Sequence, residues 1–243
     1  MNDAISHMRK YAVSAAALTL ILASSLAALS PARAEDAKTA YPDMAPIAQY
    51  QYPSQAIEIA MARSAAPASI SDNAEIMTLG AHGFETAIKG SNGFVCLVIR
   101  SWDQDFDDPE YWNPKIRSPM CLNPAAVRSV LPASLKRTEW VLAGVSRAEM
   151  LDRTKAAIAA KVITSPETGA MSFMLSKDGY LGDNVGGHWH PHVMFYIPRI
   201  DPSAWGANLP GSPVFGASSD IEPVTTFFVP VSKWSDGTPA AAH

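Results

Sequence analysis

Charged residues and cysteines are scarce in this 243-residue sequence. Asp, Glu, Lys and Arg make up 17% of it, and the 19 basic side chains, against 23 acidic ones, form no long run. Nucleic-acid binding depends on clustered positive charge, so we expect no nucleic-acid partner. Two cysteines are too few for a disulfide-built miniprotein. A chain of this length that is 48% apolar has enough apolar side chains to form a hydrophobic core, which argues against disorder.

The easily recognised catalytic motifs are missing as well. The sequence has no Gly-x-Ser-x-Gly elbow, no Ser-x-x-Lys pair, no His-Glu-x-x-His helix, no phosphate-binding glycine loop and no cysteine pair for haem attachment. These absences exclude the common serine hydrolases, zinc proteases and c-type cytochromes that carry such motifs. The sequence therefore names no reaction, and any catalytic residues stay unknown at this stage.

Residues 1–34 have the pattern of a secretory signal peptide. The basic pair Arg9-Lys10 precedes an apolar run over residues 11–29, and Ala32 and Ala34 give the small-x-small ending typical of a cleavage site. We expect cleavage after Ala34 and a periplasmic or secreted protein. No later run of 18 or more apolar residues follows, so we expect no membrane span after cleavage.

The two cysteines, Cys96 and Cys121, are predicted to form a disulfide. An exported protein meets an oxidising compartment, and an even number of cysteines leaves none unpaired. Closing a loop across their separation would stabilise the fold by about 3 to 4 kcal/mol through the lost entropy of the unfolded chain.

The remaining pattern predicts one domain at 54–243 behind an extended N-terminal arm at 35–53. Helices are predicted at 54–64, 124–130 and 146–162, each preceded or begun by a capping Ser or Asn. Apolar runs predict strands at 74–79, 84–89, 94–100, 139–145, 170–175, 192–197 and 224–231. The first three are expected to form an antiparallel meander. Strands with helices inserted irregularly indicate an α+β fold with a mostly antiparallel sheet; an α/β mixed sheet is the alternative.

Potential metal- or ligand-binding side chains are most concentrated in the segment Gly-Gly-His-Trp-His-Pro-His at residues 186–192. Its histidines, His188, His190 and His192, alternate, and alternate side chains of an extended chain face the same way. Two imidazoles at this spacing can bind one metal ion, which predicts a ligand- or metal-binding site with zinc or copper as the metal. Pro191 lacks a backbone donor, so a bend there can either gather the three rings or separate one from the others.

A fourth ligand would have to come from elsewhere, with Asp183, Asp178, His82 and Glu222 as the candidates, and Asp183 or Glu222 could serve as a general base. Three interpretations stay open. The chain is an exported protein that holds a small-molecule ligand or a metal at the histidines, a metal-dependent hydrolase whose metal activates water, or a non-catalytic periplasmic binding or envelope-associated protein with structural histidines. The sequence identifies no protein partner.

Two further segments are candidates for binding. Residues 102–112 carry five carboxylates and four aromatic rings; they begin like a calcium loop, but Asp108 stands in place of the required Gly and Pro114 in place of the required Glu. We favour a solvated loop whose tryptophans pack inward, with a platform for a sugar or a cationic ligand as the alternative. Residues 198–223, rich in Gly and Pro, are predicted to be a lid or a surface excursion.

Overall fold

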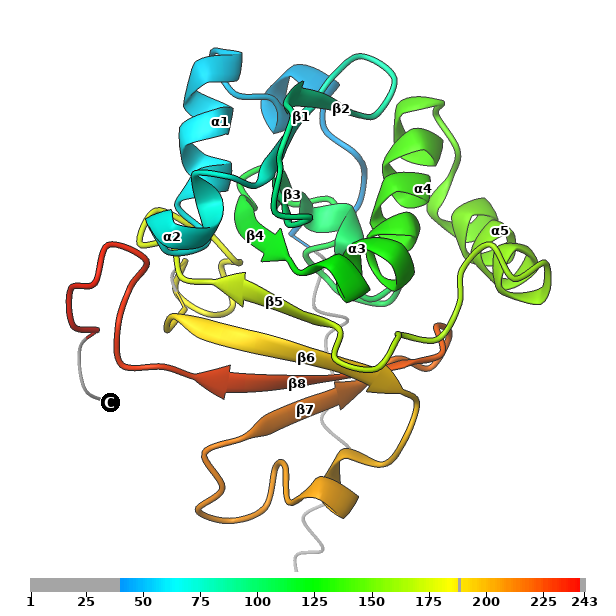
Figure 1. Cartoon of the computed structure of the whole chain (residues 1–243). Helices are drawn as coiled ribbons and strands as arrows, with labels where there is room; N and C mark the ends of the chain where they lie inside the picture. The colour runs from blue at the N-terminus through cyan, green and yellow to red at the C-terminus, as the bar shows by residue number, and fades with distance from the viewer. Residues whose placement is uncertain (1–39, 188, 241–243) are drawn as a thin grey trace, which may run out of the picture. The chain divides into compact units, whose positions relative to one another are not determined.

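The computed structural model describes residues 40–187 and 189–240, and within them an eight-stranded sheet carries helices on both faces (Figure 1). The α-helices are α1 (Gln55–Arg63), α2 (Ala68–Ser71), α3 (Pro124–Ser129), α4 (Leu131–Leu142) and α5 (Arg147–Ala159). The strands are β1 (Glu75–Leu79), β2 (Phe84–Ile88), β3 (Val95–Ile99), β4 (Ser118–Leu122), β5 (Met171–Met174), β6 (His192–Pro198), β7 (Phe215–Ser218) and β8 (Val224–Pro230). The α+β class predicted from the sequence is confirmed. The predicted signal peptide lies outside the described residues.

The strand order is β2-β1-β3-β4-β5-β6-β8-β7, with β1 and β3 parallel and every other pair antiparallel. The predicted meander of the first three strands is therefore wrong, because β3 pairs with β1 and not with β2. After β2 the chain crosses the start of β1, where Ser91 N–H donates to Asn73 O over 2.8 Å. Gly90 permits the crossing, since a Cβ there would lie 2.1 Å from Glu75 N.

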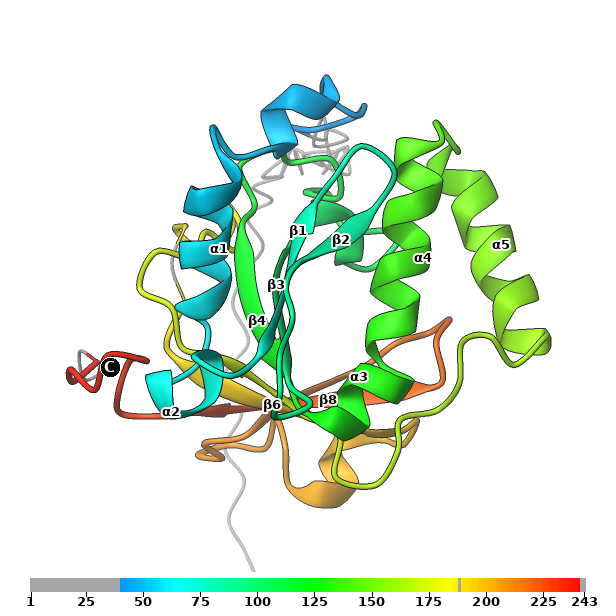
Figure 2. The ribbon, with the colours of Figure 1, turned by 45° about the horizontal axis from the view of Figure 1, so that its top comes forward.

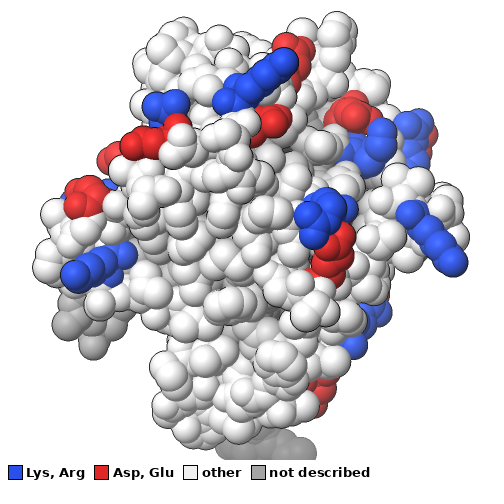
Figure 3. All heavy atoms as spheres, in the orientation of Figure 1, with Lys and Arg blue, Asp and Glu red and all other residues white. Residues whose placement is uncertain are grey.

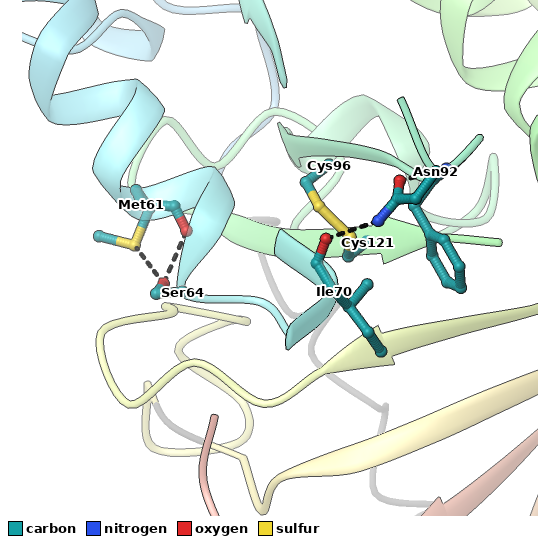
Figure 4. Close-up of a disulfide and its surroundings, with 7 residues drawn as sticks. Met61, Ser64, Ile70, Asn92, Cys96 and Cys121 are labelled. Carbon is teal, nitrogen blue, oxygen red and sulfur yellow. Dashed lines mark hydrogen bonds between the residues drawn. A yellow bond between two sulfur atoms is a disulfide. The ribbon is translucent and has the colours of Figure 1, made fainter. Parts of the chain in front are cut away.

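Helices α1 and α2 cover one face of β1, β3 and β4, which we call the back face. Ser54 caps α1 as predicted by accepting a hydrogen bond from Ile57 N–H, and Ala62 and Ala65 pack on Ile76. The predicted disulfide is present: Cys96 of β3 and Cys121 of β4 are directly paired residues, and both are fully buried on this face (Figure 4).

Helices α3 and α4 cover the opposite face, which we call the front face (Figure 2). Asn123 caps α3 as predicted, and a second helix, α4, follows it with Pro132 in its first turn. The strand predicted at residues 139–145 is wrong, because most of that segment is the last part of α4. A short apolar run such as this one fits a strand or a helix equally well, and the burial of Arg137, Thr138 and Val141 shows helical spacing.

Helix α5 begins at the predicted capping residue Ser146, whose Oγ accepts from Glu149 N–H, and ends at Ala159. The N-terminal arm is not wholly extended. Residues Ile47–Tyr50 form the 3₁₀ helix η1, and Tyr50 is fully buried against Trp102 with its hydroxyl donating to Trp112 O over 2.8 Å. The arm therefore contributes to the core. Among the described residues no helix is long and apolar enough to cross a membrane.

The segment at 198–223 contains the 3₁₀ helix η3 (Pro202–Trp205) and the edge strand β7. No charged residue occurs between Asp201 and Asp220, and Figure 3 shows little charge on the lower part of the face drawn there. Trp205 stacks on Phe227 across 5.2 Å between ring centroids and is 63% exposed. The predicted surface excursion is thus a structured extension of the sheet.

Candidate functional site

A cavity of about 420 Å³ lies between the front face of the sheet, helix α4 and two loops. Its floor consists of front-facing side chains of six strands, most of them apolar: Ile99, Ser118, Met120, Leu122, Met174, Met194, Tyr196, Ala217, Val224, Thr226 and Phe228. One loop follows β3 and brings Asp103, Asp105 and Asp108 to the cavity, and the other, of which residues 181–187 and Trp189 are described, brings Leu181 and Trp189. The cavity thus has an apolar floor and an acidic side.

Asp103 is positioned by a rigid turn. The 3₁₀ helix η2 (Ser101–Asp103) begins directly after β3, and its Trp102 is fully buried with the indole N–H donating to Thr138 Oγ1 of α4 over 3.0 Å. Asp103 N–H donates back to Arg100 O over 3.1 Å. These contacts fix the carboxylate between the end of β3 and helix α4.

The Asp103 carboxylate is poorly compensated. Its Oδ2 is buried and accepts no hydrogen bond from the described residues. Burial raises the pKa of Asp103 to about 6, against the opposing effects of the Arg137 charge and a hydrogen bond from Ser134. Burial likewise raises the pKa of Asp105. A buried carboxylate with one free oxygen at a cavity wall is the type of group that functional sites retain at a cost to stability.

Arg137 joins three segments around the cavity. Its Nη2 donates to Glu222 Oε1 over 2.6 Å, its Nη1 donates to Gln104 O over 2.8 Å, and its guanidinium lies over the Phe106 ring at 4.4 Å. Burial alone would lower the pKa of Arg137, but the charges of Glu222 and Asp103 outweigh it and raise that pKa. Arg137 is therefore a fixed cation that holds the acidic loop against α4 and the segment before β8.

A glycine-rich loop covers the other side of the cavity. Glu110 accepts hydrogen bonds from the backbone N–H groups of Asp183 and Asn184, both over 2.7 Å, which ties this loop to the acidic segment. Gly187, at φ +88°, lies against the Tyr180 ring where a Cβ would approach to 2.7 Å. The loop ends at Trp189, which is 43% exposed at the cavity edge.

His190 and His192 lie beside this cavity, at the start of β6. His192 is buried, packs against Trp189 and Phe228 at centroid distances of 4.9 and 5.8 Å, and donates from Nδ1 to His190 O over 2.8 Å. Its Nε2 has no hydrogen-bond partner among the described residues, and burial lowers the pKa of the ring. His190 is partly exposed, and His188 lies outside the described residues.

The four residues predicted as further ligands or bases lie apart from one another in the structure, and Asp178 is exposed in the segment after β5. His82 is exposed in the turn between β1 and β2. Asp183 is exposed and accepts from Lys115, Tyr180 and Tyr41, and these hydrogen bonds, led by that of Lys115, lower its pKa to about 2. Glu222 borders the cavity, bound to Arg137.

Across residues 40–187 and 189–240, no three His, Cys, Asp or Glu side chains are grouped so that they could hold a metal ion. His82, Asp183 and Glu222 therefore do not complete a ligand set with His190 and His192 in this part of the chain. The acidic segment that resembles the start of a calcium loop forms no such group either. A zinc or copper site that includes His188 stays a prediction.

Sequence reasoning missed the cavity and the role of Arg137. Residues 103, 137 and 222 come from three distant segments, and only the fold brings them together. The available signal was the cluster of acids and aromatic rings at 102–112: its tryptophans do pack inward, since Trp102 is fully buried and Trp112 nearly so. Asp103 is half-buried with its Oδ2 shielded from solvent, and is therefore not a fully solvated loop residue. Comparison with protein-family models, with curated proteins and with solved structures finds no match.

Proposed function

We propose that this chain is an exported binding protein that holds a small, mainly apolar molecule in the cavity between β3–β8 and α4. The observation that supports the proposal is the cavity itself. At about 420 Å³ it falls in the size range of small-molecule sites, and it joins an apolar floor to a few convergent polar groups, as such sites do. Export is supported by the leader-like residues 1–34 and is compatible with the disulfide.

Burial of the ligand's apolar surface on the floor would drive binding. Met120 and Met194 line the middle of the floor, and Phe228 and Trp189 lie at the side near the histidines. Methionine side chains are flexible and polarisable, so they adapt to ligands of different shape. Residues of the glycine-rich loop, among them Leu181, Val185 and Trp189, line one side of the site.

Fluorescence of the neutral dye N-phenyl-1-naphthylamine tests this proposal. We expect the dye to bind with an increase in fluorescence and at a stoichiometry of one. Met120→Trp, which fills the cavity, should weaken binding by about tenfold or more. Leu209→Trp is the matched control, because Leu209 is 50% exposed and lies outside the cavity. Equal binding by wild type and Met120→Trp, with Met194→Phe behaving the same way, would contradict the proposal.

A metal site at His188, His190 and His192 is the second candidate, and the orientation of His192 favours it. Its Nδ1–H is fixed by the His190 carbonyl, which leaves the Nε2 lone pair available, and metal-binding histidines commonly have their other nitrogen held in this way. Elemental analysis of protein purified without a His tag tests it. Stoichiometric zinc or copper in wild type and in His82→Ala, but not in His188→Ala/His190→Ala, is the expected result; metal-free wild type that takes up neither ion would refute it.

A metal-dependent hydrolase would also need a general base. Asp183 is poorly suited, because its three hydrogen bonds hold its pKa at about 2, far below the range of an effective base at neutral pH. Glu222 is bound to Arg137 and faces the cavity. These contacts favour binding over hydrolysis for this part of the molecule.

A further inference from the structure

The polar side of the cavity carries an excess of negative charge. Asp103, Asp105, Asp108 and Glu222 line it, and among the residues that the structure describes the other charged residues on its walls are Arg137 and Arg100. The charge of Arg100 is already paired, because its Nη2 forms a buried salt bridge of 2.8 Å with Glu58 outside the cavity. The wall thus combines one available guanidinium, that of Arg137, with four acidic residues, of which Asp108 already accepts a hydrogen bond from Glu110 N–H over 2.6 Å.

Arg137 has little capacity left to bind an anionic ligand. Its Nη1 donates to two backbone carbonyls, its Nη2 donates to Glu222, and one face of the guanidinium is covered by Phe106. Among its nitrogens, only Nε lacks a hydrogen-bond partner among the described residues. A carboxylate or phosphate that entered the cavity would gain a single donor and would be repelled by the surrounding acids.

Asp103, in contrast, has one carboxylate oxygen, Oδ2, that accepts no hydrogen bond from the described residues. Its carboxylate is acted on by Ser134 and Arg137 of α4, by Glu222 before β8 and by Arg100, which directly follows β3. None of them donates a hydrogen bond to Oδ2, although that atom is buried. An unpaired, buried carboxylate oxygen gains most from a donor that also carries positive charge.

Resting on the binding function proposed above, we propose that the ligand carries an ammonium group, which donates to Asp103 at the acidic side while its apolar body lies on Met120, Met194 and Phe228. The four carboxylates then face two cations, Arg137 and the ligand. The proposal assigns the recognition of the ligand's head group to Asp103. Arg137 serves as a positioning residue that holds Glu222 and the acidic loop.

Competition between octylamine, octanol and octanoate for the bound dye tests this assignment. The three probes share one alkyl chain and differ only in whether the head group is a cation, neutral or an anion. For wild type at pH 7.5, we expect octylamine to displace the dye at a concentration about tenfold or more below that of octanol, with octanoate the weakest. In Asp103→Asn this preference for the amine should fall to about threefold or less, while the affinity for octanol stays the same.

Asp107→Asn is the matched control, because Asp107 belongs to the same acidic segment but is exposed and does not line the cavity. It should keep the wild-type preference. Glu222→Gln is the second variant if Asp103→Asn does not fold, and it should also lower the preference for the amine. Protonation of Asp103 at pH 5 should weaken octylamine without weakening octanol.

The outcomes separate the two proposals. If the dye does not bind and none of the three octyl compounds binds, the binding function itself is wrong. If octanol binds as well as octylamine, the cavity is a binding site but the assignment of an ammonium group is wrong. If octanoate binds best, Arg137 recognises the ligand in place of Asp103, and the assignment is overturned.

Discussion

Replacing Asp103 by Asn should stabilise the protein, and the gain should depend on pH. Asp103 has a pKa of about 6 in the folded state, above the usual value of 3.8. Between these two values the folded chain holds a proton that the unfolded chain has lost, so the free energy of unfolding falls as the pH rises. A difference of roughly two pKa units corresponds to about 3 kcal/mol once both states are ionised.

Asn resembles the protonated carboxyl group and avoids this loss. We therefore expect Asp103→Asn and wild type to have equal stability near pH 4, and the variant to gain stability through pH 5 and 6, up to about 3 kcal/mol at pH 7 and above. Urea unfolding at each pH measures the difference. Asp107→Asn, at an exposed position, should change the stability by less than about 0.5 kcal/mol at every pH. An Asp103→Asn variant that is less stable than wild type at pH 7, or equally more stable at pH 4 and pH 7, would refute this account of the carboxylate.

Three further predictions concern the scaffold. Glu58→Ala should destabilise the fold by about 3 to 5 kcal/mol in urea unfolding, because it leaves the buried charge of Arg100 without its salt-bridge partner. Glu139→Ala, from the exposed pair with Lys136, should cost less than about 1 kcal/mol. Equal costs would contradict the role of burial. Removing the disulfide with Cys96→Ala/Cys121→Ala should cost about 3.5 kcal/mol for its 25-residue separation, and an unchanged urea midpoint would show that the bond adds no stability. Asn208→Gly should cause self-association, seen by size-exclusion chromatography at rising concentration. The Asn208 amide pairs with both N–H and C=O of Gly216 on edge strand β7, and Gly would keep the positive φ of residue 208 while leaving that edge unpaired. A variant that elutes like wild type at all concentrations would argue against this protection of the edge.

Local signals in the sequence predicted local structure well. The caps Ser54, Asn123 and Ser146 begin the helices predicted for them, and the apolar runs at 170–175, 192–197 and 224–231 are β5, β6 and β8. Each of these depends on neighbouring residues, such as a side-chain oxygen that accepts the N–H group three residues later. The pairing of Cys96 with Cys121 also followed, because no other partner exists.

Long-range arrangement could not be predicted in the same way. The crossing at Gly90 depends on how close two backbones come, which no local pattern records, and a wrong pairing of β3 was the result. Helix α4 was mistaken for a strand in its last part because its apolar run is short. The cavity could not be predicted, because Asp103, Arg137 and Glu222 come together only after the chain folds. The alternating histidines, in contrast, form a pattern that is visible in the sequence itself.

A crystal structure of the protein with octylamine bound tests the central claim most directly. We predict the alkyl chain on the front face, in contact with Met120, Met194 and Phe228, and the nitrogen within hydrogen-bond distance of Asp103. Octylamine bound only at the exposed aromatic surface near Trp205 and Phe215, with the cavity holding none of it, would contradict both the binding site and the role of the carboxylate.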